Sequence, residues 1–288
     1  MMEFNDGMIC VLGLDTTPFT GKKPMPLFDH SLHPTMVTMS HSFRRSICVL
    51  FSALTLTLSC IAIHPVRAQQ PNVNHSARHQ LAIERARSNL HLDAPGSANR
   101  QVALADALLR AGKVDDSIPH YENAIKQSPD MRPYLWQYGI ALFFAGRFED
   151  GRELFEAHRR VNPNDVENAA WHFLCEAKAN GIESARKLLL PAPGDRRIPM
   201  SEILDRLPGG DATKIEAAVN AIHQPASKQS ARFYADLYLG LIADAEGKPK
   251  DAQAFMTRAA KTPMAHYMAD VARVYANHLK ASAKPDEQ

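Results

Sequence analysis

Apolar residues recur at helical spacing along most of the chain. The segment PMAHYMADVARVYANHLKAS, residues 263–282, shows this clearly, because its apolar positions return every three or four residues. No run of alternating β-branched residues is long enough to predict a strand. The pattern therefore predicts an all-α fold.

The helical pattern is itself repeated along the chain. A spacing of 34 residues separates Pro95, Pro129 and Pro163, and it also separates Gly112 from Gly146 and Tyr121 from Phe155. A further copy of the pattern lies near residues 233–263. A period of 20–50 residues indicates stacked supersecondary units, and 34 residues is the length of one helix–turn–helix unit.

The residue types at the repeated positions have a physical reason. Small residues lie where the two helices of a unit must approach closely, at Ala105, Gly139 and Gly240. A glycine follows each first helix, where a positive φ is needed, at Gly112, Gly146 and Gly247. Each second helix carries a small residue and then a large one, in the pairs Ser117 and Tyr121, Gly151 and Phe155, and Ala252 and Met256.

On these positions, residues 98–165 resemble two consecutive tetratricopeptide repeats (TPRs), and 233–263 resembles another. Residues 166–190 resemble a degenerate third repeat. The resemblance implies a right-handed α-solenoid of helix–turn–helix units, closed by a C-terminal capping helix. An export signal followed by a few repeats and a closing helix is also similar to the NlpI-type exported TPR lipoproteins of bacteria.

The repeats and the stretches around them divide the chain into consecutive segments. We expect an upstream extension outside the fold at 1–38, a signal peptide or N-terminal anchor at 39–68, a leading helix at 69–97, TPR units 1–3 at 98–190, a helical insertion at 191–225, TPR unit 4 with the capping helix at 226–282, and a tail at 283–288.

The region before the repeats predicts export. A basic pair, Arg44-Arg45, precedes an uncharged apolar stretch, residues 47–63. Val66 and Ala68 then stand at the −3 and −1 positions of a signal-peptidase site. We therefore expect a periplasmic or secreted protein.

The fate of this signal has three readings. Cleavage would leave Gln69 as the first residue, and a start at Met36 or Met39 would give a signal of ordinary length. The apolar stretch is also just long enough to remain as a membrane anchor. A lipoprotein anchored at Cys60 is the third reading, although Thr57 fits the lipidation motif poorly. All three place the rest of the chain outside the cytoplasm.

Composition removes several classes of function. The chain is 45% hydrophobic and 22% charged, which is an ordinary globular mixture. Its net charge of +2 excludes nucleic-acid binding across the whole surface, so no nucleic-acid partner is expected. A mean hydropathy of −0.28 excludes a protein with many membrane spans. Beyond residue 68 the only cysteine is Cys175, so no internal disulfide is expected there.

The resemblance implies that the first helices of the units form a concave face that binds a partner. Trp136 and Trp171 give this face the aromatic character of an interface core, unless they pack between adjacent units instead. We expect the protein-binding groove to be lined by Asp106, Trp136, Gln137, Ile140, Phe143, Glu167, Trp171 and Tyr234.

The partner is not expected to present a C-terminal carboxylate. Some TPR domains hold such a group with lysine, asparagine and arginine on the concave face. The matching positions here hold Val102, Asp106, Gln137, Glu167 and Trp171. An apolar or mildly basic segment is therefore the expected ligand.

Two clusters suggest chemistry but do not complete a site. Asn168, His172 and Cys175 share one helix face, but no oxyanion donor or second supporting element accompanies them. His75 and His79 could supply two metal ligands, but no third ligand is near in sequence. We therefore expect no catalytic, cofactor or metal site.

The sequence as a whole favours a non-enzymatic adaptor or scaffold of the bacterial cell envelope, with a protein or peptide partner and membrane contact only through a retained anchor. Two alternatives from other classes stay open. One is an envelope-polymer hydrolase with its site in 191–225, where Arg196 and Arg197 could also touch an anion. The other is a structural protein that self-associates. The acidic residues of that insertion, which show no recognisable catalytic arrangement, are Asp195, Glu202, Asp205 and Asp211.

Overall fold

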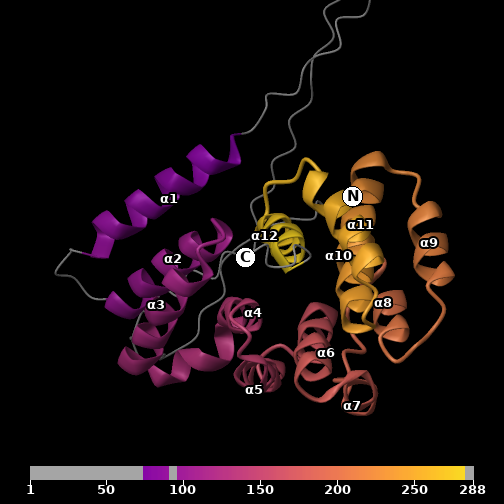
Figure 1. Cartoon of the computed structure of the whole chain (residues 1–288), viewed down its shortest axis with the longest axis horizontal. Coiled ribbons are helices and arrows are strands. Elements are labelled where there is room, and N and C mark those ends of the chain that lie inside the picture. Colours follow the sequence, from indigo (N-terminus) through magenta and orange to yellow (C-terminus); the bar gives the residue numbers. More distant parts are fainter. Residues whose placement is uncertain (1–73, 91–95, 283–288) are drawn as a thin grey trace, which may run out of the picture. The chain divides into compact units, whose positions relative to one another are not determined.

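The computed structural model describes residues 74–90 and 96–282 (Figure 1). These residues form twelve α-helices and one short 3-10 helix, and they contain no strand. The predicted all-α solenoid is confirmed. The segments expected to be the upstream extension (1–38), the signal or anchor (39–68) and the tail (283–288) lie outside the described residues.

The helices follow the chain in hairpins. Helix α1 (His75–Leu90) comes first, and unit 1 consists of α2 (Ser97–Arg110) and α3 (Val114–Gln127). The later elements are η1 (Pro129–Tyr134), α4 (Trp136–Phe144) and α5 (Phe148–Arg159) in unit 2, α6 (Val166–Asn180) and α7 (Ile182–Lys187) in unit 3, α8 (Met200–Arg206) and α9 (Thr213–Asn220) in the insertion, α10 (Pro225–Ala245) and α11 (Pro249–Lys261) in unit 4, and finally α12 (Tyr267–Ser282).

The stack of hairpins continues past the insertion. The two helices of each unit pack on each other, and α5 packs on α6 of the following unit. Helix α6 also packs directly on α10, although the 191–225 segment separates them in sequence. Helix α8 packs beside both α6 and α10. The insertion is therefore an addition to the stack and does not interrupt it.

Three turns between paired helices have the same geometry. Gly112, Gly146 and Gly247 have φ values of 77°, 74° and 69°. In each turn the amide of the following residue donates to a carbonyl five residues earlier, as Arg147 N does to Leu142 O at 2.9 Å. This is the Schellman ending of a helix, in which a left-handed residue satisfies the last free carbonyls. The sequence expectation of a positive φ after each first helix is confirmed.

The small residues of the first helices lie at close helix–helix contacts. A Cβ atom added to Gly139 would stand 2.5 Å from Cζ of Phe155, and one added to Gly240 would stand 3.0 Å from Cε of Met256. Phe155 and Met256 are themselves buried on the second helices. The complementary small and large positions therefore set how closely each hairpin closes.

Helix α12 (yellow in Figure 1) does more than close the end of the array. It packs on α11, as a capping helix should, and also on α2 of the first unit. Its Tyr275 ring lies 5.7 Å from that of Phe143 on α4 and 6.3 Å from that of Trp171 on α6. The Tyr275 hydroxyl donates to Asp244 Oδ2 on α10 at 2.5 Å. The last helix thus joins all four units.

Candidate functional site

The predicted groove residues fall into two groups in the structure. Ile140, Phe143 and Trp171 are almost completely buried, with exposed fractions of 0%, 3% and 2%. Tyr275 of α12 covers Phe143 and Trp171. A partner cannot reach these side chains while α12 is in place. The partly buried group comprises Asp106, Trp136, Gln137, Glu167 and Tyr234.

Asp106 is held inside the array by two tyrosines. The hydroxyl of Tyr121 on α3 donates to its Oδ1 at 2.5 Å, and that of Tyr267 on α12 lies 3.4 Å from the same oxygen. Burial raises the pKa of Asp106 to about 6, although both hydroxyls favour the charged form. Asp106 therefore connects α2 to α12 and is not directed at a ligand.

Two of the remaining groove residues, Trp136 and Tyr234, belong to pairs of aromatic rings. The rings of Trp136 and Tyr267 meet edge to face at 4.9 Å, and those of Tyr234 and His266 stack at 5.9 Å. His266 and Tyr267 are neighbours in sequence, so the backbone links the two ring pairs, and we call these four residues the aromatic strip. All four are partly buried, and they come from α4, α10 and the start of α12. Arginine side chains lie over two of the rings, Arg110 at 5.3 Å from the centre of Tyr267 and Arg197 at 5.7 Å from that of Tyr234.

A group of carboxylates around Arg197 lies at one edge of the strip. Arg197 pairs with Asp165 at 3.1 Å, with Asp195 at 2.7 Å and also with Glu167, and its guanidinium lies 5.7 Å from the centre of the Tyr234 ring. Burial and the neighbouring charge of Glu167 raise the pKa of Asp165 to about 6. Three carboxylates share one guanidinium, so this edge is acidic when they are ionised.

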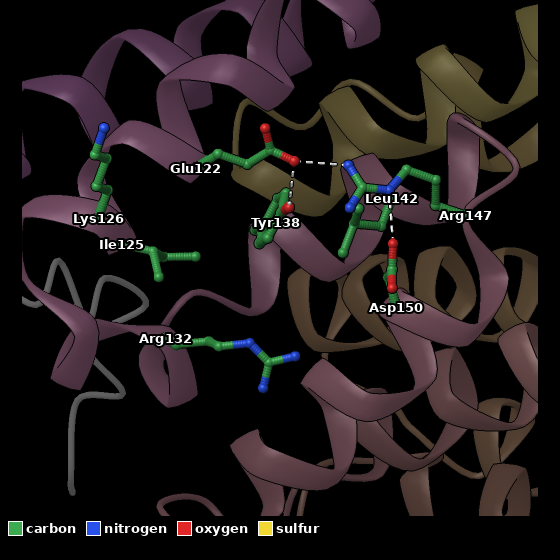
Figure 2. A pocket seen from close by; sticks show the side chains of 8 residues that line it. All are labelled: Glu122, Ile125, Lys126, Arg132, Tyr138, Leu142, Arg147 and Asp150. Carbon is green, nitrogen blue, oxygen red and sulfur yellow. Dashed lines mark hydrogen bonds and ion pairs between the residues drawn. The ribbon is translucent and has the colours of Figure 1, made fainter.

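A separate pocket lies between units 1 and 2. It has a volume of about 330 Å³ and is bordered by α3, η1, α4 and α5 (Figure 2). Ile125 and Leu142 provide apolar contacts, and Arg132 extends its guanidinium into the space. Sequence reasoning did not find this pocket, because none of its residues belongs to the predicted concave face.

One side of this pocket is a fixed polar network. Arg147 donates to Glu122 and to Asp150, each at 2.7 Å, and the Tyr138 hydroxyl donates to Glu122 at 3.1 Å. Burial and the nearby Glu122 charge raise the pKa of Tyr138 to about 12, so its phenol remains a donor at neutral pH. The carboxylates of Glu122 and Asp150 therefore both accept hydrogen bonds from within the protein.

Sequence comparison supports the repeat architecture. Residues 102–166 match the model of the tetratricopeptide repeat family. The matched residues begin within α2, cover α3 through α5 and end at the first residue of α6. No curated protein sequence matches the chain. The TPR match supports a role in protein–protein interaction and leaves the partner undefined.

The catalytic-looking residues of the third TPR unit each have a structural partner. Asn168 donates to the Phe155 carbonyl at 3.1 Å, and His172 Nε2 lies 3.3 Å from Glu156 Oε1. Cys175 is fully buried, and burial raises the pKa of its thiol well above its usual range. A buried thiol that resists ionisation is a poor nucleophile, so the structure gives no support to a catalytic thiol here.

The histidines of α1 lie beside an acid that the sequence could not associate with them. His75, His79 and Asp270 have potential ligand atoms within 4.8 Å of one another. The guanidinium of Arg78 lies among them, 3.4 Å from His75 Nδ1, 3.3 Å from His79 Nε2 and 2.5 Å from Asp270. A metal ion would have to displace this cation, so the residues present do not fit a metal centre.

The acidic residues of the insertion have separate positions. Asp195 belongs to the group around Arg197, where its Oδ2 also lies 3.3 Å from the amide of Val166. Asp211 accepts from the amide and hydroxyl of Thr213 at the start of α9. Asp205 is exposed. Asp195 and Asp211 thus stabilise local structure, and Arg197 of the basic pair is an internal ion-pair donor.

Proposed function

We propose that this chain is a non-enzymatic, exported TPR adaptor that binds a protein or peptide segment along the aromatic strip. The observation that carries the proposal is the pairing of Trp136 with Tyr267 and of Tyr234 with His266, four residues that come from different helices and are only partly buried. Partly buried aromatic rings held by a rigid frame are the usual anchors of protein interfaces.

The strip suits an apolar segment with a basic residue at one end. Its rings offer flat apolar contact area, and their fixed positions reduce the entropy lost on binding. The carboxylates Asp165, Glu167 and Asp195 stand at its edge with only Arg197 among them. A lysine or arginine of the partner would complete the charge balance there.

Export is supported by the sequence alone. The apolar stretch 47–63 lies outside the described residues, and no helix within 74–90 or 96–282 is both long and apolar enough to cross a bilayer. We propose that the chain acts in the bacterial periplasm or is secreted, in an architecture like that of NlpI-type proteins. N-terminal sequencing of exported protein should begin at Gln69, whereas a retained leader would support the anchored form.

Site-specific crosslinking tests the binding surface. We would place p-benzoylphenylalanine at Tyr234 in the strip and, as a matched control, at Leu188, which is 52% exposed after α7. Irradiation in the producing cells should give a protein adduct from position 234 and none from position 188. The adduct should disappear when Trp136→Ala is added. No adduct at 234, or equal adducts at both positions, would contradict the proposal.

A further inference from the structure

We propose that the pocket between α3 and α5 is a second binding site, which takes an acidic side chain and an adjacent aliphatic side chain of a peptide. This pocket lies apart from the aromatic strip. Tyr138 and Leu142, which line it, are on the face of α4 opposite Trp136 and Phe143, because successive helical residues are rotated by about 100°. Occupancy of one site therefore leaves the other open.

The acidic groups of the pocket already have a cation beside them. Glu122 and Asp150 are both hydrogen-bonded to Arg147, and Glu122 also accepts from Tyr138. A basic ligand would have to share these carboxylates with Arg147, whose positive charge already offsets part of theirs. The wall formed by Glu122, Arg147 and Asp150 is thus a closed network that shapes the pocket.

The available charge in the pocket is positive. Arg132 points its guanidinium into the space, as Figure 2 shows, and the one ion pair that it makes within the described residues, with Glu153, is long at 3.9 Å. Glu153 is itself 58% exposed, so that pair is weak. Lys126 stands at the rim, and the described residues include no ion pair for it. Arg132 can therefore donate hydrogen bonds to a carboxylate, and Lys126, whose ammonium points away from Arg132 in Figure 2, adds positive charge at the edge of the pocket.

The rest of the lining is apolar. Ile125 is partly buried and lines the pocket, while Leu142 is 1% exposed and lies between Tyr138 and Arg147 in Figure 2. The volume of about 330 Å³ is at the lower end of the range for ligand pockets. That size suits one or two side chains better than a cofactor. A glutamate or aspartate beside a leucine-like residue matches both halves of the lining.

A direct titration tests this site. The probe is a fluorescein-labelled peptide, Gly-Leu-Glu-Leu-Gly with an amidated C-terminus, titrated with the full-length chain at low salt and followed by fluorescence anisotropy. Saturable binding is expected. Arg132→Gln should weaken it by about tenfold, the effect of losing one charge-assisted hydrogen bond. Replacing the peptide glutamate with glutamine should weaken it similarly.

Two further variants separate this site from general charge effects. Glu153→Gln removes the competitor for Arg132 and should strengthen binding by about two- to fivefold. Arg160→Gln removes an exposed arginine outside the pocket and should change nothing. Misfolding cannot imitate the gain expected for Glu153→Gln. The proposal is overturned if no saturable binding occurs below about 1 mM, or if Arg132→Gln and Arg160→Gln behave alike. Neither result affects the crosslinking test at Tyr234.

Discussion

The hydroxyl of Tyr121 on α3 lies 2.5 Å from the carboxylate of Asp106 on α2, and it is the closer of two tyrosine donors to that group. The carboxylate nevertheless has a pKa raised to about 6, because burial outweighs both hydrogen bonds. In the unfolded chain the same group ionises near its usual 3.8. Folding is therefore linked to protonation at this position.

The sign of this linkage gives the first prediction. A raised carboxyl pKa favours the folded state fully below about pH 3.8, and the benefit is lost as the pH rises through about 6. Asp106→Asn cannot ionise. Its free energy of unfolding relative to wild type should therefore be higher at pH 8 than at pH 4 by about 1–3 kcal/mol. Urea unfolding at the two pH values measures this, and exposed Asp130→Asn is the control. An equal difference at both pH values would show that Asp106 is not linked to folding.

Asp270 gives a prediction of opposite sign. Burial disfavours its charge, but hydrogen bonds from His79, Arg273 and Arg110 hold its pKa below the usual range. Its contribution to stability is thus present above about pH 3.8 and is lost in stronger acid. Asp270→Asn leaves three arginines without their shared anion and should cost about 3–5 kcal/mol at neutral pH.

Two measurements check the Asp270 prediction. Thermal unfolding should show the loss of stability, and hydrogen exchange should show α1 opening, because Arg78 of α1 pairs with this carboxylate. Glu183→Gln, which removes an exposed ion pair with Arg186, should cost at most about 1 kcal/mol. Equal effects of the two variants would show that Asp270 does not hold α1 in place.

The close contact at Gly139 predicts overpacking. Leucine at this position would force atoms against Phe155 and Leu154, which lie within 3 Å of even an added Cβ. Gly139→Leu should lower the free energy of unfolding by about 1–3 kcal/mol. Asn123→Leu places the same side chain at an exposed position of α3 and should change stability by less than about 0.5 kcal/mol. An unchanged melting temperature for Gly139→Leu would mean that the repeat register is wrong.

The thiol of Cys175 should be unreactive in the folded protein. It is fully buried, and its pKa is raised by burial, so the thiolate needed for alkylation is scarce. Peptide mapping after iodoacetamide treatment should find Cys175 unlabelled in native protein and labelled in guanidinium chloride. Rapid labelling of the native protein would reveal access that the packing does not show.

The repeat fold could be predicted because its determinants are local. Gly146 ends a helix, and Gly139 allows the ring of Phe155 to pack closely against the backbone. Both features lie within one hairpin, so they appear in the sequence as residue types at a fixed spacing. The contact between Tyr275 and Phe143 cannot be predicted in this way, because it joins residues more than 130 positions apart and follows no repeat spacing. The groove predicted on the first helices stays a prediction, and it did not anticipate that α12 packs on Phe143 and Trp171.

The aromatic strip and the pocket near Arg132 also differ in how far the sequence could predict them. The helical periodicity predicts Trp136 and Tyr234 as groove residues, and both belong to the aromatic strip. The other half of the strip comes from the start of α12, which no repeat position describes. The pocket near Arg132 depends on the gap between two neighbouring hairpins and on the 3-10 turn between them. Neither property follows from the periodicity of residue types.

The place of α12 makes the earlier units depend on the last helix of the described array. In a simple solenoid each unit depends only on its neighbours, so units can be gained or lost at an end. Here a chain that stopped before residue 267 would leave Phe143 and Trp171 in water, because Tyr275 covers both. The earlier hairpins therefore cannot complete their packing until Tyr275 has been synthesised.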